Sequence, residues 1–333
     1  MLLIETGSRI HLGFFNTINS YTAYGSIGMS LKEPSYMMSV DVHDSILIEN
    51  DKSDRVLPIC QQIVRLLNIG GLKIRVFDEI PSHVGFGSTT QLKLALGVSA
   101  SRLYNLRMSV RDLAGLVGLG FASGIGIASF EDGGFIIDSG RFLSENKIIP
   151  PVTGSNDIPK VISRIKIPTS WRFILATPLH KKGFSEDNER IIMMNPRPMP
   201  PSISSEISRL ILTGLIPAIL WNNPKLFGKF LTKIQFMVGE YFKPIQGGIF
   251  CCEETEFIVK TLISLGAYGA GQSSWGPTAY GIIDNDQLAK RILNKLKHRL
   301  EKKDINAKIM ITRPRNHGAK IKSIPNRLYI QKL

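Results

Sequence analysis

Residues 81–90 read PSHVGFGSTT and stand between a segment with the period of a strand and a segment with the pattern of a helix. In residues 72–76, apolar and basic side chains alternate, which predicts a strand with one polar face. Gly85 and Gly87 lack a Cβ atom, so the backbone can turn sharply there and approach a ligand closely. A strand, a glycine-rich loop and a helix therefore follow one another.

The head of the helix expected after this loop is a candidate anion site. Its first backbone N–H groups have no partner within the helix, and the helix dipole places positive charge there. Ser88, Thr89 and Thr90 add hydroxyl donors at the same point. The loop fits neither of the two common nucleotide-binding glycine patterns. Two interpretations stay open: a phosphate-binding loop, or a plain strand-to-helix turn with Ser88 as its N-cap.

Length and composition predict two globular domains. The 333 residues exceed one ordinary domain, and a hydrophobic fraction of 43% with 20% charged residues is typical of a folded protein. Residues 144–168 are rich in Pro, Asn, Ser and Gly, which places the expected boundary there and divides the chain into domains at 1–160 and 161–333. Because strands and helices mix throughout, we expect an α+β or α/β fold.

The net charge of +14 raises the question of an anionic partner. The basic residues are scattered and form no arginine-rich arm, so we expect no nucleic-acid partner. A polyanionic small substrate would gain from such a field. The densest basic segment, residues 290–303, has apolar residues at helical spacing and predicts an amphipathic helix. The three cysteines give no paired framework and are expected to be reduced thiols.

The chain shows no signal that predicts a membrane protein. Its first residues lack the basic and apolar regions of a signal peptide. The longest apolar run, residues 210–221, contains Thr213, Gly214 and Pro217, and it is too short to span a bilayer. We therefore expect a buried helix there and a cytoplasmic protein without membrane contact. A homodimer is the default expectation for a soluble oligomer.

Hydrophobic periodicity and capping residues predict the other elements. Strands are expected at residues 2–5, 9–15, 37–49, 133–138, 171–176 and 307–312. Helices are expected at residues 56–67, 110–118 and 254–265, and directly after residues 90 and 223.

Two further segments strengthen the functional interpretation of the glycine-rich loop. Residues 7–16 read GSRIHLGFFN, and residues 266–277 read GAYGAGQSSWGP. Together with the loop, and in this order, they resemble the three motifs of the GHMP kinase superfamily, the small-molecule kinases of galactose, homoserine and mevalonate. The resemblance implies an α+β fold whose N-terminal domain contains a left-handed βαβ unit. It also implies a ferredoxin-like C-terminal domain, with the ligand in the cleft between the two.

One position departs from the kinases of this superfamily. Mevalonate kinase carries a catalytic aspartate at the end of a Ser-Gly-Ile-Asp segment. The matching residues 123–126 of this chain read Ser-Gly-Ile-Gly, so Gly126 stands in place of the aspartate. A glycine cannot deprotonate or orient a hydroxyl group. An ATP-dependent small-molecule kinase stays as the alternative, because homoserine kinases manage without this aspartate. A catalytically inactive member that only binds metabolites is the third interpretation.

The complete set of motifs resembles the β-ribofuranosylaminobenzene 5′-phosphate synthase family within this superfamily. The resemblance rests on RIHLGF at residues 9–14, SGIG at 123–126, FEDGGF at 130–135 and QSSWGP at 272–277. It implies an archaeal enzyme of methanopterin biosynthesis that condenses phosphoribosyl pyrophosphate with 4-aminobenzoate or 4-hydroxybenzoate and releases CO₂ and pyrophosphate. Mg²⁺ is the expected cofactor, and its ligands are not assigned.

The candidate site residues follow from these motifs and from the need to pair buried anions. The candidate catalytic residues are Arg9, His11 and Glu131. The candidate residues for binding substrate and phosphate are Gly85, Gly87, Ser88, Thr89, Lys93, Gly269, Gly271 and Ser273.

Each of these candidates has a structural alternative. Arg9 could be a charge on a strand face, and Lys93 a solvated helix residue. His11 could be a hydrogen-bonded core histidine, and Glu131 a turn carboxylate. The glycine-rich segment after Gly266 could be a loop between two elements.

Overall fold

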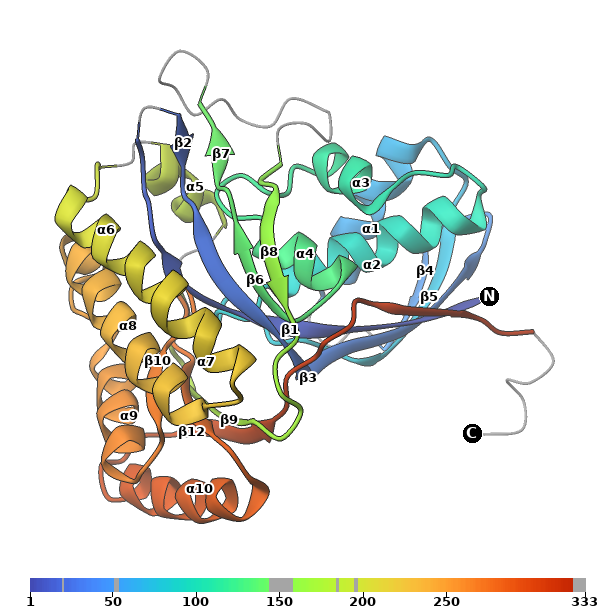
Figure 1. Ribbon diagram of the computed structural model, residues 1–333. Coiled ribbons are helices and arrows are strands. Elements are labelled where there is room, and N and C mark those ends of the chain that lie inside the picture. Colours follow the sequence, from blue (N-terminus) through green and yellow to red (C-terminus); the bar gives the residue numbers. More distant parts are fainter. Residues whose placement is uncertain (20, 51–53, 144–157, 184–185, 195–196, 326–333) are drawn as a thin grey trace.

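The structure is a computed structural model, and it describes residues 1–19, 21–50, 54–143, 158–183, 186–194 and 197–325 (Figure 1). Two long antiparallel strands, β1 (Leu2–Phe14) and β3 (Ser26–Val42), organise the N-terminal sheet. Among the described residues this sheet has seven strands, in the order β13-β1-β3-β5-β4, with β6 (Phe135–Asp138) paired to β3 and β8 (Val161–Ile165) paired to β6. The two strands predicted near the N-terminus are thus one strand.

The βαβ unit expected from the resemblance lies at one edge of this sheet. It consists of β4 (Leu47–Glu49), α1 (Val56–Leu67) and β5 (Leu72–Asp78), and the two strands are parallel. β5 lies between β3 and β4, so the chain must leave the sheet after Val42 to reach the other side of β5. This crossing interrupts the strand that was predicted to continue through residues 37–49.

Four helices cover one face of the N-terminal sheet (Figure 1). They are α1, α2 (Ser88–Leu103), α3 (Val110–Leu116) and α4 (Ile125–Glu131). α2 is buried along most of its length and packs against β1 and β3. A capping box begins α3, because the side chains of Ser109 and Asp112 each accept a hydrogen bond from the other residue's backbone N–H. The central position of α2 holds the preceding glycine-rich loop over β1.

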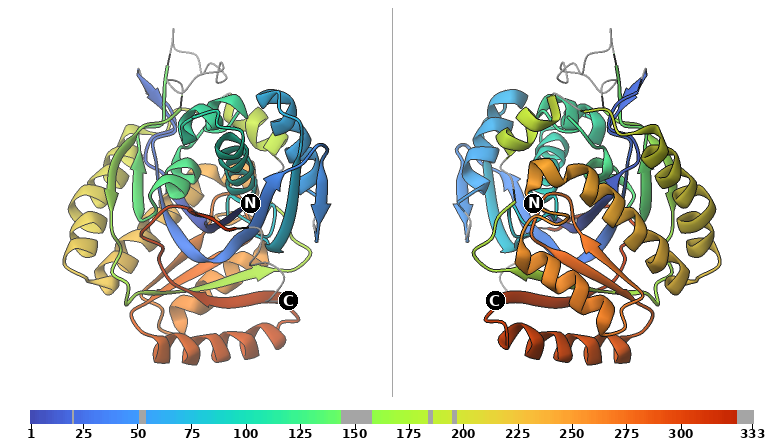
Figure 2. Two further views of the ribbon diagram at one scale, coloured as in Figure 1. Left: turned by 90° about the vertical axis from the view of Figure 1, so that its right-hand side faces the viewer. Right: turned by 90° about the vertical axis from the view of Figure 1, so that its left-hand side faces the viewer.

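The C-terminal domain is built on an antiparallel sheet with the strand order β10-β11-β9-β12. Its strands are β9 (Arg172–Pro178), β10 (Gly269–Gln272), β11 (Ala279–Ile283) and β12 (Ala307–Thr312). α9 (Glu253–Ser264) and the basic helix α10 (Asp286–Glu301) pack against this sheet (Figure 2). Numbered along the chain, the strand order is 2-3-1-4, which is the arrangement of the ferredoxin-like fold that the resemblance implies.

α8 (Pro224–Gln246) connects the C-terminal sheet with the N-terminal domain, because it contacts both β10 and β1. As the sequence predicts, Asn223 caps this helix by accepting a hydrogen bond from the N–H of Leu226, and Pro224 occupies the first turn. α8 therefore forms a shared wall between the two domains.

Strands that follow residue 160 pair with strands that precede it, so the two domains share one sheet. β8 and β13 (Lys320–Ser323) both follow residue 160, yet β8 pairs with β6 and β13 pairs with β1. The chain therefore enters and leaves the ferredoxin-like sheet from strands of the N-terminal sheet. The division at residue 160 stays a prediction.

Among the described residues, one helical stretch, Pro201–Leu220, is long and apolar enough to cross a membrane by length and composition. It comprises α6 (Pro201–Leu210), a π-helical turn (Ile211–Leu215) and α7 (Ile216–Leu220). Leu210, Leu215 and Ile219 are buried in the core, and the stretch packs against α8. The stretch is thus a partly buried core helix, as predicted for residues 210–221.

Candidate active site

A crevice with a volume of about 600 Å³ opens between the two domains. Its N-terminal wall combines Arg9 and His11 of β1, the loop at residues 83–87, the start of α2 and residues 116–123. Its C-terminal wall comes from α5 (Glu186–Met194) and residues 274–276. This volume is typical of a small-molecule site. Three segments that are remote in the sequence therefore meet around one ligand-sized space.

The start of α2 faces this crevice. Gly87, the N-cap, has a left-handed conformation with φ 70°, and no side chain caps the helix. The first hydrogen bond into the turn is donated by the N–H of Gln91 to the carbonyl of Gly87 at 3.1 Å. The N–H groups of Ser88, Thr89 and Thr90 thus precede the hydrogen bonds of the helix. All three residues line the crevice, so the helix presents its positive end to a ligand.

Arg55, which the sequence did not single out, adds a cation at this point. Its guanidinium donates hydrogen bonds to the hydroxyl groups of Ser88 at 3.2 Å and of Thr89 at 2.6 Å. Arg55 directly precedes α1, where a cation is unfavourable beside the positive end of a helix. This unfavourable position of a cation was the signal in the sequence by which Arg55 could have been identified. Its distance from the start of α2 depends on how α1 packs, and the sequence does not reveal that packing.

Arg9 lies on the crevice wall beside the glycine-rich loop. Its Nη1 donates to the carbonyl of Gly85 at 2.6 Å, and its backbone N–H donates to the carbonyl of Phe86 at 3.1 Å. A Cβ atom at Gly87 would approach Nε of Arg9 to 2.9 Å. Burial lowers the pKa of Arg9, and the Glu189 carboxylate acts in the opposite direction. The guanidinium is therefore held tightly against the loop.

His11 lies two residues further along β1 and is buried. Its Nδ1 accepts a hydrogen bond from the N–H of Gly13 at 3.3 Å, while Nε2 has no hydrogen-bond partner among the described residues. Burial lowers the pKa of His11 to about 3, and the nearby charge of Arg9 acts in the same direction. His11 is therefore neutral. Because Nδ1 accepts, the proton is on Nε2.

Ser273 joins the two domains at the crevice without lining it. Its Oγ donates to the carbonyl of Gly85 at 2.6 Å and accepts from the N–H of His11 at 3.1 Å. The residues that follow it, 274–276, are the ones that line the crevice. The third motif thus contributes a hydrogen-bonded connection between the domains and part of the crevice wall.

Gly269 and Gly271 belong to β10 and do not line the crevice. A Cβ atom at Gly269 would lie 2.2 Å from the carbonyl oxygen of Gly228 in α8. A Cβ atom at Gly271 would lie 2.4 Å from Cγ of Gln235. These two glycines therefore allow α8 to approach the strand. Their proposed ligand contact stays a prediction, and the arrangement gives them a packing function.

The two remaining charged candidates have different surroundings. Lys93 lines the crevice one turn into α2, and its Nζ lies 3.4 Å from the carbonyl of Val117. Glu131 ends α4 and forms an ion pair with Arg111 at 3.1 Å. Burial raises the pKa of Glu131, which Arg111 partly opposes. Glu131 does not line the crevice, so nothing in this geometry brings it to a ligand there.

α5 contributes two charged residues that complete the C-terminal wall. Glu189 and Arg190 line the crevice, and the guanidinium of Arg190 lies 5.3 Å from the centre of the Phe121 ring. α5 reaches the crevice only because it packs against the other domain.

Gly126, which stands at the position of the kinase aspartate, packs closely against Thr90. It lies in the first turn of α4, and its carbonyl accepts a hydrogen bond from Nε2 of Gln91 at 2.8 Å. A Cβ atom at this position would lie 2.9 Å from Cγ2 and 3.3 Å from Oγ1 of Thr90. A carboxylate side chain at this position would therefore require the Thr90 side chain to move.

Two family models match the chain. Residues 55–134 match the N-terminal domain of GHMP kinases, and residues 215–302 match the C-terminal domain of GHMP kinases. Among solved structures, a homoserine kinase from Cytophaga hutchinsonii aligns with a TM-score of 0.65 and 16% identity, over 96% of this chain and 97% of that chain. The mevalonate kinase of Methanococcus jannaschii aligns with a TM-score of 0.61 and 17% identity, over 94% and 98%. At these identities the structural likeness shows the fold alone.

Curated relatives give a finer comparison. The β-ribofuranosylphenol 5′-phosphate synthase of Methanothermobacter thermautotrophicus is 32% identical over 298 residues, which cover 85% of this chain and 89% of the relative. The protein of the same name from Methanocaldococcus jannaschii is 30% identical over 341 aligned positions, which cover 96% and 100%. The chain therefore belongs to the β-ribofuranosylphenol 5′-phosphate synthase family of the GHMP kinase superfamily.

Proposed function

We propose that this protein joins phosphoribosyl pyrophosphate to 4-hydroxybenzoate, with release of CO₂ and pyrophosphate, in methanopterin biosynthesis. The relatives share the name β-ribofuranosylphenol 5′-phosphate synthase at 30–32% identity over most of the chain. That name specifies a phenol as the aromatic part of the product. Of the two acids expected from the sequence, it therefore favours the hydroxy acid over the amino acid. The geometry of the crevice supports this activity.

At each of the two reacting carbons, one bond breaks and one new bond forms. The C–O bond between the ribose anomeric carbon and pyrophosphate breaks, and pyrophosphate takes the electron pair. The ring carbon that bears the carboxylate forms the new C–C bond to the anomeric carbon. The bond to the carboxylate then breaks, and its electron pair restores the aromatic ring as CO₂ leaves. Negative charge thus develops on the leaving pyrophosphate.

One observation carries the proposal: the uncapped start of α2 faces the interdomain crevice. Its N–H groups and the hydroxyl groups of Ser88 and Thr89 can bind phosphate oxygens. Fixed donors aimed at developing charge lower the barrier, because they need no reorganisation during the reaction. The guanidinium of Arg9 and the ammonium of Lys93 line the same space and supply positive charge. We assign these groups to the pyrophosphate and to the ribose phosphate.

Mg²⁺ fits this site as an ion that is carried by the substrate. Among the described residues, no group of three His, Cys, Asp or Glu side chains could form a protein cage for a metal. Mg²⁺ is commonly bound by one or two carboxylates together with substrate phosphates. Glu189 and the hydroxyl groups at the start of α2 line the crevice and would hold it. When bound, the ion would neutralise charge on the pyrophosphate.

The alternative, an ATP-dependent kinase, is disfavoured by the packing around Gly126. The kinase aspartate is missing, and Thr90 occupies the space that its side chain would need. Cytoplasmic location and a homodimer stay predictions from the sequence.

A decarboxylation assay tests the proposed function. The purified protein is incubated with Mg²⁺, phosphoribosyl pyrophosphate and carboxyl-labelled 4-hydroxybenzoate, and the released CO₂ is counted. A parallel panel measures ATP consumption with homoserine, mevalonate and sugars. Release of label without ATP consumption is the expected result. Consumption of ATP on one panel substrate, without release of label, would establish the kinase instead.

A further inference from the structure

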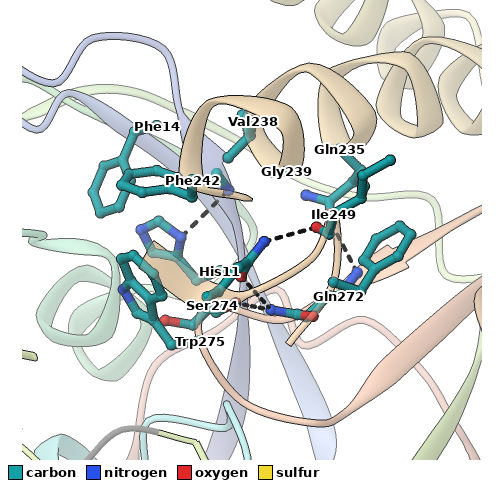
Figure 3. A pocket seen from close by; sticks show the side chains of 13 residues that line it. His11, Phe14, Gln235, Val238, Gly239, Phe242, Ile249, Gln272, Ser274 and Trp275 are labelled. Atoms are coloured by element: carbon teal, nitrogen blue, oxygen red, sulfur yellow. Dashed lines mark hydrogen bonds between the residues drawn. The ribbon is translucent and has the colours of Figure 1, made fainter. Parts of the chain in front are cut away.

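A pocket separate from the crevice lies between the glycine-rich loop and the C-terminal sheet. This back pocket has a volume of about 180 Å³, and residues of the loop, of β9 and β12, and of the segment 179–182 line it together with Pro34. It shares one lining residue, Phe86, with the crevice. The recess beside His11 differs, because it has a volume of about 40 Å³ and shares four residues with the crevice wall (Figure 3). That recess belongs to the site already described.

The glycine-rich loop separates the back pocket from the crevice. Val84 and Phe86 line the back pocket, whereas Gly85 and Gly87 line the crevice. The segment that closes the other side of the back pocket is joined to the same loop, because the N–H of Gly183 donates to the carbonyl of His83 at 2.7 Å. A ligand in the back pocket would therefore contact the loop on the side that faces away from the crevice.

The floor of the back pocket is one face of the C-terminal sheet. Leu175 pairs with Met310 and Thr177 pairs with Lys308 across β9 and β12. Alternate residues of a strand point to the same face, so all four side chains share this floor. Leu175 belongs to the core cluster that also contains Val84 and Phe86 of the loop, and Met310 packs against that cluster. Apolar side chains of both domains thus enclose the body of the pocket, which favours an apolar ligand.

The rim of the back pocket is basic. Lys181, Lys182 and Lys308 line the pocket and are exposed, and none of its described lining residues is acidic. Lys181 is paired with Glu254 at 3.1 Å. Within the part of the chain that the structure describes, neither Lys182 nor Lys308 takes part in an ion pair. Lysine side chains can cover apolar surface with their stems while the ammonium group stays at the edge. Two ammonium groups are therefore available to an anion at the mouth of an apolar pocket.

We propose that the back pocket binds a small molecule with an apolar body and one anionic group. The apolar body lies between the loop and the floor, and the anionic group lies at Lys182 and Lys308. By volume the pocket has room for on the order of ten water molecules, so its ligand has on the order of ten non-hydrogen atoms. A peptide helix or a two-chain lipid is too large. This inference does not depend on the proposed function, because it concerns a different space.

Calorimetric titration with octanoate tests the site, since octanoate is a carboxylate of about this size. The wild-type protein should bind one molecule per chain. Butyrate, which lacks four of the methylene groups, should bind at least about 100-fold more weakly. Octan-1-ol, which lacks the charge, should bind at least about tenfold more weakly. Absence of saturable octanoate binding, or equal affinity for octan-1-ol, overturns the inference.

Two variants test where the octanoate binds. Lys308→Glu reverses a charge at an exposed position, so it should leave the fold intact and weaken octanoate binding at least about tenfold. Met310→Trp enlarges a side chain of the floor and should weaken binding by a similar factor without changing the charge. Unchanged affinity in Lys308→Glu, or in a folded Met310→Trp variant, means that octanoate binds elsewhere and overturns the inference.

Each variant has a matched control at an exposed position outside the back pocket. Lys297→Glu on α10 makes the same change of charge, and Leu220→Trp at the end of α7 introduces the same ring. Both should bind octanoate with the affinity of the wild type. A loss of affinity in Lys297→Glu as large as that in Lys308→Glu would reflect the net charge of the protein instead of a local site, and would also overturn the inference.

Discussion

The two glycine-rich segments of this chain look alike in sequence but differ in what their glycines do. In the loop at residues 81–88, Gly85 and Gly87 have positive φ values of 97° and 70°, and they bring the backbone to the crevice. In β10, Gly269 and Gly271 are ordinary strand residues that face α8. The loop glycines line the crevice, whereas the strand glycines allow a helix to pack.

This difference shows that glycine content alone does not identify a binding loop. The loop is followed by a helix that starts at the crevice, and that start provides donors. β10 instead packs against α8, and neither of its two glycines lines the crevice. A glycine-rich segment binds anions when its backbone N–H groups are free. The same composition supports packing when another element covers it.

The largest effect should come from Gly269→Ala. The new Cβ atom would lie 2.2 Å from the carbonyl oxygen and 2.4 Å from the Cα atom of Gly228, and backbone atoms cannot move aside easily. We expect a loss of about 3 kcal/mol or more in the free energy of unfolding, measured with denaturant. Gly266→Ala is the control. Gly266 has φ 100° but open space around it, so its loss should be about 1–2 kcal/mol.

Arg9→Ala should have the next largest effect, this time on catalysis. It removes the cation beside the loop, which we assign to developing charge on the phosphates. We expect kcat/KM for phosphoribosyl pyrophosphate to fall at least about 100-fold in a variant that remains folded. Arg209→Ala, which removes an exposed arginine on α6, is the control. Normal turnover in Arg9→Ala would remove Arg9 from the site.

Ser273→Ala should give a smaller change in both properties, because Ser273 connects the two segments. The variant loses the hydrogen bonds to the carbonyl of Gly85 and from the N–H of His11. We expect about a tenfold fall in kcat/KM and a loss of about 1–2 kcal/mol in stability. Ser264→Ala, which removes a local hydrogen bond in α9, should leave activity unchanged. If Ser273→Ala lost only stability, the two segments would be independent.

Local signals predicted many of the elements accurately. The helix at residues 56–67 was predicted from its apolar stripe, and the strand that begins at residue 72 from its alternation; both are present in the structure. The break after Val42 was missed, because it follows from the position of β5 between β3 and β4. The contact of Arg55 with Ser88 and Thr89 was missed for the same kind of reason.

The sequence by itself determined the glycine-rich loop and the helix start of the candidate anion site, because the two are adjacent in the chain and their backbone geometry is local. Motif order also predicted the fold and the family. Only the tertiary structure decided which glycines face the crevice and which face a helix. It also placed His11 among Phe14, Phe242 and Trp275, with its donor unpaired. Phe242 and Trp275 are more than 200 positions away from His11 in the chain, and the physical reason is that packing selects partners by shape and burial, which local periodicity does not encode.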